Sequence, residues 1–140
     1  LRYKCEPFVQ GQDRATDDMA FSDNYIFVGL ETENGAILRI NKSDISQINE
    51  INTDIQNKSF GTFYNGEDIW AVFNSVPGKI VRINPSNNSL YTYTFPQDNN
   101  YPNEIATDGQ YLFVSFYTAP AKIAKLRFDN SIFSLFSIIK

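Results

Sequence analysis

The sequence predicts an all-β protein built from three similar four-stranded antiparallel units. Three observations support this fold class. The chain matches itself at a shift of 43 residues, each copy holds four short runs rich in β-branched and aromatic residues, and no run has the 3.6-residue apolar period of an amphipathic helix. Four strands per repeat at a period in the low forties is typical of a β-propeller blade. We therefore predict a β-propeller segment of three blades, preceded by one outer strand.

The repeat keeps one register through both later copies without a gap. Residues at equivalent positions lie 43 apart: Tyr25, Asp68 and Tyr111; Ile37, Ile80 and Ile123; Ile40, Ile83 and Leu126; and the bases Arg39, Arg82 and Lys125. The bases share a strand position, so we expect each to reach an acid or a carbonyl of an adjacent blade. A ring of bases that binds an anion is the alternative.

A tight turn joins the first two strands of each unit. The first strand is expected around 19–21, 62–64 and 105–107, and the turns are "SDN", "NGE" and "DGQ". Asn-Gly and Asp-Gly favour hairpins because these turns need positive φ. The second strands, "IFVGL", "IWAVF" and "LFVSF", are nearly continuous apolar runs. Such runs are typical of strands buried on both faces.

The third and fourth strands complete each blade. The third strands are "AILRI", "KIVRI" and "KIAKL", and the fourth strands, "SQINEI", "SLYTYT" and "SIFSLFS", alternate apolar and polar residues as half-exposed outer strands do. The blades are expected at about 16–58, 59–101 and 102–140, within one domain spanning 1–140. Residues 1–9 fall on the fourth-strand position of a preceding or closing blade, where we interpret Cys5 as a small buried hydrophobe.

Three blades do not close a ring. A closed propeller needs at least about four blades, so both terminal blades are expected to leave an apolar flank that a partner must cover. Two solutions are open. Two copies of the chain complete a ring around a two-fold axis, or the chain is part of a larger context, either a longer protein whose missing blades complete the ring or another protein on which it packs as an open arc.

Charge and composition exclude several classes of function. The 140-residue chain has a net charge of −4, which gives no electrostatic support to nucleic-acid binding, and no apolar run approaches the about 18 residues of a membrane span. It contains no histidine, the commonest general base and metal ligand. The chain begins at Leu1 without a signal-peptide pattern, which predicts a processed or excised piece. The compartment stays unassigned, with an extracellular or surface location favoured.

The middle of the chain resembles a known repeat. It carries an apolar-Trp-apolar run at 69–72, "GKIVRI" at 78–83, an outer strand ending in Pro96, and "PNEIATDG" at 102–109. This pattern is similar to the blades of virginiamycin B lyase-like, YVTN and NHL-type propellers. The resemblance covers nearly the whole chain and implies the propeller fold.

The resemblance implies less about activity. Lyases of this family place His and Glu around a Mg²⁺ ion on the ring face. This chain has no histidine, and the positions just after the second strand, where such blades often place Glu, hold Leu30, Phe73 and Phe116. Lyase chemistry is therefore not expected from this segment alone.

Candidate ligand contacts lie in the loops that join second to third strands and in the segments between blades. They are Tyr117, Phe116, Asn74, Glu31, Glu33, Asn103 and Glu104. Tyr117 follows its strand beside a proline-containing loop, which favours ligand contact, whereas Trp70 lies within an apolar strand and is expected in the core. Mg²⁺ or Ca²⁺ would bind only if Glu31, Glu33, Asp17 and Asp18 cluster, and no calcium-loop spacing supports this, so no cofactor is predicted.

These observations predict a non-catalytic binding or assembly module. It would complete its ring with another copy or with missing blades, and would bind a protein, a glycan or a small ligand on the loop face. Two alternatives are open. One is an enzyme of the lyase or lactonase type whose catalytic residues lie outside this segment, and the other is a structural component of a virion or cell surface.

Overall fold

The computed structural model describes residues 15–32, 35–96, 98–129 and 132–139. Within them, twelve strands form three four-stranded antiparallel sheets, each with its strands in chain order. Blade one is β1 (Ala15–Phe21), β2 (Tyr25–Leu30), β3 (Ala36–Asn41) and β4 (Ile48–Asn52); blade two is β5 (Ser59–Tyr64), β6 (Ile69–Phe73), β7 (Lys79–Ile83) and β8 (Leu90–Thr94); blade three is β9 (Pro102–Thr107), β10 (Tyr111–Phe116), β11 (Lys122–Asp129) and β12 (Ile132–Ile139). The predicted all-β fold is confirmed. The outer strand expected at 1–9, with Cys5, lies outside the described residues.

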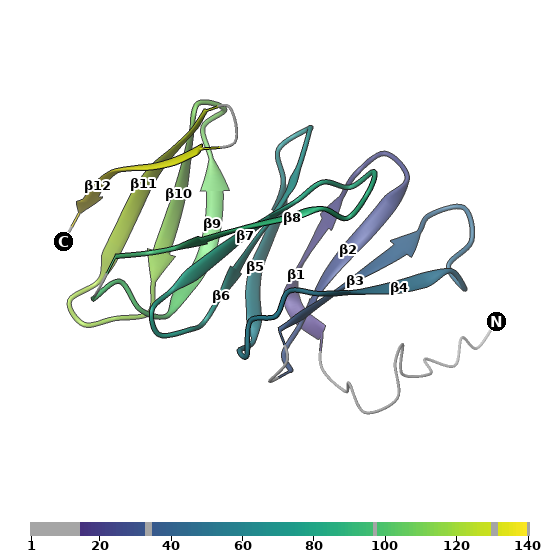
Figure 1. Ribbon diagram of the computed structural model, residues 1–140, viewed down its shortest axis with the longest axis horizontal. Coiled ribbons are helices and arrows are strands. Elements are labelled where there is room, and N and C mark those ends of the chain that lie inside the picture. The colour runs from purple at the N-terminus through teal and green to yellow at the C-terminus, as the bar shows by residue number, and fades with distance from the viewer. Residues whose placement is uncertain (1–14, 33–34, 97, 130–131, 140) are drawn as a thin grey trace.

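The three blades stand side by side in chain order (Figure 1). The inner strand β5 contacts both β1 and β9, while the outer strands β4 and β8 carry mostly exposed side chains. The alternation predicted for the outer strands thus reflects their position at the rim of the segment. The described residues include no helix long and apolar enough to cross a membrane.

Side-chain oxygens fix the turns in the same way in successive blades. Asn65 Oδ1 accepts hydrogen bonds from two backbone N–H groups of the β5–β6 turn at 2.9 and 2.7 Å, and Asp108 Oδ1, 43 residues later, does the same in the β9–β10 turn at 2.9 and 2.7 Å. Asn41 and Asn84 cap the turns after β3 and β7, at 2.8 and 2.9 Å. Asn and Asp recur in these turns because their short side chains replace a backbone acceptor.

The inner strands begin earlier than the sequence predicts. They start at Ala15, Ser59 and Pro102, and in each blade the pairing with the second strand shifts register before the segment we expected. A bulge breaks the two-residue alternation on which strand recognition depends, so the pattern revealed only the part beyond it. A bulge also increases the local twist of a sheet, so its recurrence at the same place gives the three sheets a similar twist.

The core lies between blades. One cluster joins Phe27 and Ile37 of blade one to Ile69, Phe73 and Val81 of blade two. A second cluster, which contains the fully buried Trp70, joins blade two to β10 and β11 of blade three. Burial of each large apolar side chain contributes roughly 1.5–3 kcal/mol. Burial also raises the pKa of Tyr93, which packs against the second cluster.

The outward face of blade three is uncovered. Ile37 and Ile80 are 0% exposed, whereas the equivalent Ile123 is 44% exposed, because no fourth blade is present among the described residues. For the same reason β6 is buried on both faces, as predicted for second strands, whereas β10 alternates between buried and half-buried residues.

Truncation of equivalent isoleucines should therefore have unequal effects. We expect Ile80→Ala to lower the free energy of unfolding by about 2–4 kcal/mol, because it opens a cavity between two blades. Ile123→Ala should cost less than about 1 kcal/mol, since its side chain is already partly hydrated. Urea unfolding followed by circular dichroism measures both, and equal losses would contradict the packing described here.

Acid should weaken the β9–β10 turn. Backbone hydrogen bonds from Tyr111 and Gln110 hold the pKa of Asp108 below its ordinary value of 3.8. A lowered folded-state pKa means that this stabilisation is present above about pH 4 and is lost as the pH falls through the folded pKa. Asp108→Asn keeps the acceptor, as Asn65 shows, so its melting temperature should fall less than that of the wild type below about pH 4. Identical pH profiles would refute the assignment.

Candidate functional site

The loops that hold the candidate ligand contacts lie at one edge of the sheets. Antiparallel strands alternate in direction, so the loops after the second strands (31–35, 74–78 and 117–121) and the connections between blades (53–58 and 95–101) emerge on the same side. This face combines segments that are far apart in the sequence.

Backbone hydrogen bonds set the position of the residue just after β6 and of the residue just after β10. The N–H of Asn74 donates to the carbonyl of Lys58 at 3.0 Å, and the N–H of Tyr117 donates to the carbonyl of Tyr101 at 2.8 Å. The two donor residues are 43 positions apart in the sequence, and so are the two acceptor residues. Glu31, Asn74 and Tyr117 are thus equivalent positions with different side chains.

The two proline loops are built alike. Ser75 Oγ donates to the carbonyl of Pro77 at 2.8 Å, and Thr118 Oγ1 donates to that of Pro120 at 3.0 Å. Both prolines follow a cis peptide bond. The two hydroxyl hydrogen bonds fix the backbone of the residues that flank each loop.

Tyr117 and Tyr101 are exposed aromatic residues of the loop face. Their side chains are 79% and 42% exposed, and they are joined through the backbone hydrogen bond. An open depression of about 500 Å³ lies beside Tyr117 and is lined by Phe116, Tyr117, Thr118, Ala119 and Ala121. Phe116 lines it from the core, where its ring meets the Phe95 ring edge-on at 5.0 Å. An open surface with a free aromatic ring suits stacking on a planar or apolar ligand.

The acidic candidates that the structure describes do not form a cluster. The Glu31 carboxylate forms an ion pair with Lys58 Nζ at 2.8 Å. The backbone carbonyl of the same lysine accepts the hydrogen bond from the Asn74 N–H, so Lys58 contacts both candidate residues. Asn103 and Glu104 lie on the inner strand β9. Among the described residues no three carboxylates, cysteines or histidines could hold a metal ion together, while Glu33 and the side chain of Asp17 lie outside them.

The recurring bases share a partner position that the sequence did not reveal. Each contacts the first position of its own blade's second-strand block: the Arg39 guanidinium lies 4.2 Å from the Tyr25 ring centroid, Arg82 Nε lies 2.5 Å from Asp68 Oδ2, and Lys125 Nζ lies 3.7 Å from the Tyr111 ring centroid. These are diagonal neighbours across adjacent strands. Arg39 also donates to Asn88 Oδ1 of blade two at 2.6 Å, which is a contact with an adjacent blade of the kind predicted for all three bases. The contacts described for Arg82 and Lys125 lie within their own blades.

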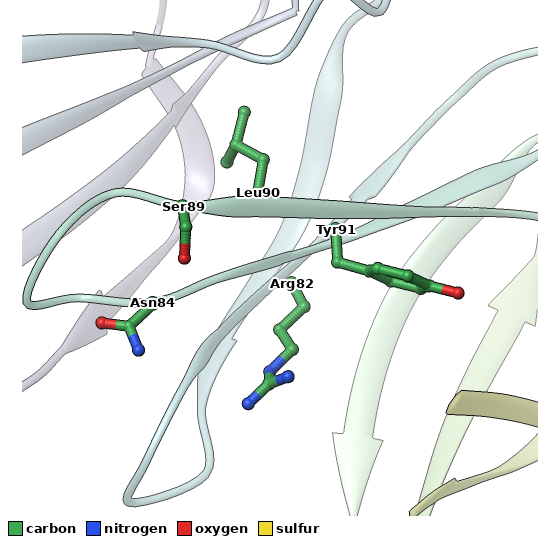
Figure 2. A pocket seen from close by; sticks show the side chains of 5 residues that line it. All are labelled: Arg82, Asn84, Ser89, Leu90 and Tyr91. Carbon is green, nitrogen blue, oxygen red and sulfur yellow. The ribbon is translucent and has the colours of Figure 1, made fainter. Parts of the chain in front are cut away.

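Two further depressions lie outside the predicted site. One, of about 170 Å³, is lined by Arg82, Asn84, Ser89, Leu90 and Tyr91 of the β7–β8 hairpin, and Figure 2 shows Leu90 on the opposite side of the hairpin from Arg82. The other, of about 500 Å³, is formed by the turns of blades one and two. Sequence patterns show such residues only as turn formers, because the depressions depend on how hairpins and blades pack.

Solved structures of one enzyme share this architecture. Selenomethionine-substituted virginiamycin B lyase from Staphylococcus aureus matches with a TM-score of 0.72 and 26% sequence identity, over 94% of this chain and 44% of the lyase chain. This chain resembles part of the virginiamycin B lyase propeller. A catalytically inactive variant of that lyase, in a structure with quinupristin, matches with a TM-score of 0.65 and 25% identity, over 84% of this chain and 39% of the lyase chain.

The similarity to virginiamycin B lyase confirms the resemblance drawn from the repeat, and this chain spans less than half the length of the lyase. No protein-family model matches the sequence, and neither does any curated protein. The likeness therefore rests on the arrangement of blades together with about a quarter of identical residues.

The buried ion pair of blade two should be sensitive to the loss of one partner. Asp68 is fully buried, so Arg82→Met leaves a carboxylate without its cation, and we expect a loss of about 3–5 kcal/mol in unfolding free energy. The double variant Asp68→Leu/Arg82→Met removes both charges and should be more stable than Arg82→Met. Chemical denaturation compares the three proteins; a double variant less stable than Arg82→Met would exclude an uncompensated charge as the cause.

Proposed function

We propose that this chain is a non-catalytic binding and assembly module: a partial propeller that completes its ring with further blades and binds a ligand on the loop face around Tyr117. The ligand class is a protein, a glycan or a small molecule. The observation that carries the proposal is the large exposure of Tyr117 at a loop fixed by hydrogen bonds on both sides.

Preorganisation supports binding at this loop. The Tyr117 backbone is tied to Tyr101, and the Thr118 hydroxyl is tied to Pro120. Ordering a flexible loop costs free energy on association, so a loop that is already fixed retains more of its stacking energy. Tyrosine suits such a contact because its large ring has few rotatable bonds.

The similarity to virginiamycin B lyase favours a second candidate, an enzyme of the lyase or lactonase type. The chain has no histidine, and Glu31 is engaged by Lys58. In this alternative the catalytic histidine and further acids come from blades beyond this segment. Quinupristin is the natural first probe, since it accompanies the lyase variant. Turnover of quinupristin by the 140-residue chain alone would contradict the non-catalytic proposal.

Tyr117→Ala should remove binding without loss of fold. A buried aromatic anchor contributes at least about 1.4 kcal/mol, so we expect about a tenfold weaker affinity for quinupristin, measured by isothermal titration calorimetry. The variant should keep its unfolding free energy within about 0.5 kcal/mol, because the side chain is exposed. Tyr91→Ala, which truncates an exposed tyrosine on β8, is the matched control. Where quinupristin does not bind the wild type, the same comparison uses an oligosaccharide panel, and equal affinities of both variants would refute the site.

The proposal that the chain completes its ring by assembly is tested by its mass in solution. Light scattering gives the absolute mass, which is 16.0 kDa for one chain. A larger mass supports association through the blade flanks. A 16.0 kDa species that unfolds in one cooperative transition contradicts the need for further blades.

A further inference from the structure

An open depression of about 500 Å³ lies between the turns of blades one and two, at the end of the sheets opposite to the loop face. In Figure 1 the β1–β2 and β5–β6 turns point to the top of the view, whereas the loops that follow β6 and β10 lie at the bottom. The β7–β8 turn supplies a third wall. The depression is lined by residues 22–25, by Tyr64, Gly66 and Glu67, and by Pro85 and Ser86.

Hydrogen bonds fix each of the three turns. In the β1–β2 turn the Ser22 carbonyl accepts a hydrogen bond from Lys42 Nζ, and in the β5–β6 turn Asn65 Oδ1 accepts two from backbone N–H groups. The β7–β8 turn is tied to blade one, because Arg39 donates to Asn88 Oδ1 at 2.6 Å. The walls are thus preorganised, so a ligand loses little binding free energy to the ordering of these turns.

Two tyrosine rings of the depression are not required by the repeat. Tyr25 and Tyr64 are both half-buried, and the Tyr64 hydroxyl donates to the Gly66 carbonyl at 2.8 Å, which fixes the position of its ring. One repeat later, at the junction of blades two and three, the equivalent residues are Asp68 and Thr107. Positions that the scaffold needs recur every 43 residues, so rings that the second junction lacks are suited to ligand contact.

The charges around the depression balance. Asp23 and Glu67 are exposed and contribute two carboxylates to its walls. Two bases contact the same walls: Lys42 through the β1–β2 turn, and Arg39, whose guanidinium lies over the Tyr25 ring at 4.2 Å from the centroid. A cationic ligand would meet a ring that a guanidinium already covers, and an anionic ligand would meet the carboxylates. The surroundings therefore favour a neutral ligand that donates hydrogen bonds.

We propose that this depression is a second binding site, which takes a neutral saccharide of one or two sugar units. The rings of Tyr25 and Tyr64 pack against the apolar C–H face of a sugar ring, and the carboxylates of Asp23 and Glu67 accept hydrogen bonds from its hydroxyl groups. A volume of about 500 Å³ lies within the range of small-ligand pockets. The site is independent of the proposed loop-face site around Tyr117, which lies at the other end of the sheets.

Chemical-shift mapping by nuclear magnetic resonance tests the location of the site. The isotope-labelled 140-residue chain is titrated with methyl glucoside, methyl galactoside, N-acetylglucosamine and cellobiose. We expect at least one of these sugars to shift the amide signals of residues 22–25 and 64–67 and to leave those of 117–119 unchanged. Shifts confined to 117–119 would place saccharide binding on the loop face and overturn the proposal. Absence of shifts with all four sugars would also overturn it.

Two double variants test the chemistry of the ligand. Asp23→Ala/Glu67→Ala removes both acceptors and should raise the dissociation constant of the bound sugar about tenfold, with an unchanged melting temperature because both side chains are exposed. Asp23→Asn/Glu67→Gln keeps an acceptor at each position and should raise it only about threefold. Blade three already holds Gln110 at the position equivalent to Glu67. Equal losses in the two variants would show that charge holds the ligand, which would overturn the assignment to a neutral saccharide.

A third variant tests the aromatic contact. Tyr64→Leu keeps apolar bulk beside the core of blades one and two but removes the planar ring, so we expect at least about fivefold weaker binding of the same sugar. Tyr91→Leu, at an exposed tyrosine on β8 outside the depression, is the matched control and should bind as the wild type does. Equal affinities of the two leucine variants would overturn the proposed stacking. Binding through Tyr117 is followed by different amide signals, so failure of either site is recognised separately.

Discussion

The packing of one blade's sheet face on the next blade is the interaction on which this structure depends. Phe27 and Ile37 on one side and Phe73 and Val81 on the other form a core that neither blade could form alone. Apolar surface removed from water contributes roughly 25 cal/mol per Å², so a four-stranded sheet with both faces apolar is stabilised by a neighbouring sheet on each face. Among the described residues, the inner strand β5 contacts β1 and β9, whereas no comparably extensive contact joins the outer strands β4 and β8, which carry mostly exposed side chains.

This constraint explains why the fold could be predicted from the sequence. A strand covered on both faces needs an unbroken apolar run, and β6 meets that need with five fully buried residues. In the turns between first and second strands, a side-chain oxygen of Asn or Asp accepts hydrogen bonds from backbone N–H groups of the turn. Asn65 and Asp108 do this in successive blades, 43 residues apart. Both requirements return with every blade, so they appear in the sequence as a 43-residue period. The inner-strand bulge left no such mark, because it interrupts alternation without requiring a particular residue type.

The candidate site was only partly predictable, for a different physical reason. Tyr117 follows its strand beside a proline-containing loop, which led us to expect ligand contact there, and the structure shows its side chain exposed. The pairing of Glu31 with Lys58 joins residues 27 apart in the chain and depends on how the connection between blades folds back. Likewise, the sequence shows Tyr25, Asp68 and Tyr111 in one column and the bases in another, but only the strand register reveals that the two columns meet. Local pattern therefore indicates which residues are exposed, whereas tertiary packing determines which of them are already engaged.

The connection between two blades packs against a loop of the loop face. At the junction of blades two and three, the connection 95–101 lies against the loop after β6: Gly78 N–H donates to the Asn99 carbonyl at 3.0 Å, and Tyr101 N–H donates to the Ser75 carbonyl at 3.1 Å. Those contacts leave Asn74 half-buried and Ser75 buried, whereas the equivalent Tyr117 is 79% exposed. Glu31, Asn74 and Tyr117 are equivalent positions with different side chains. The repeat therefore determines the scaffold, and ligand specificity would depend on the positions where the blades differ.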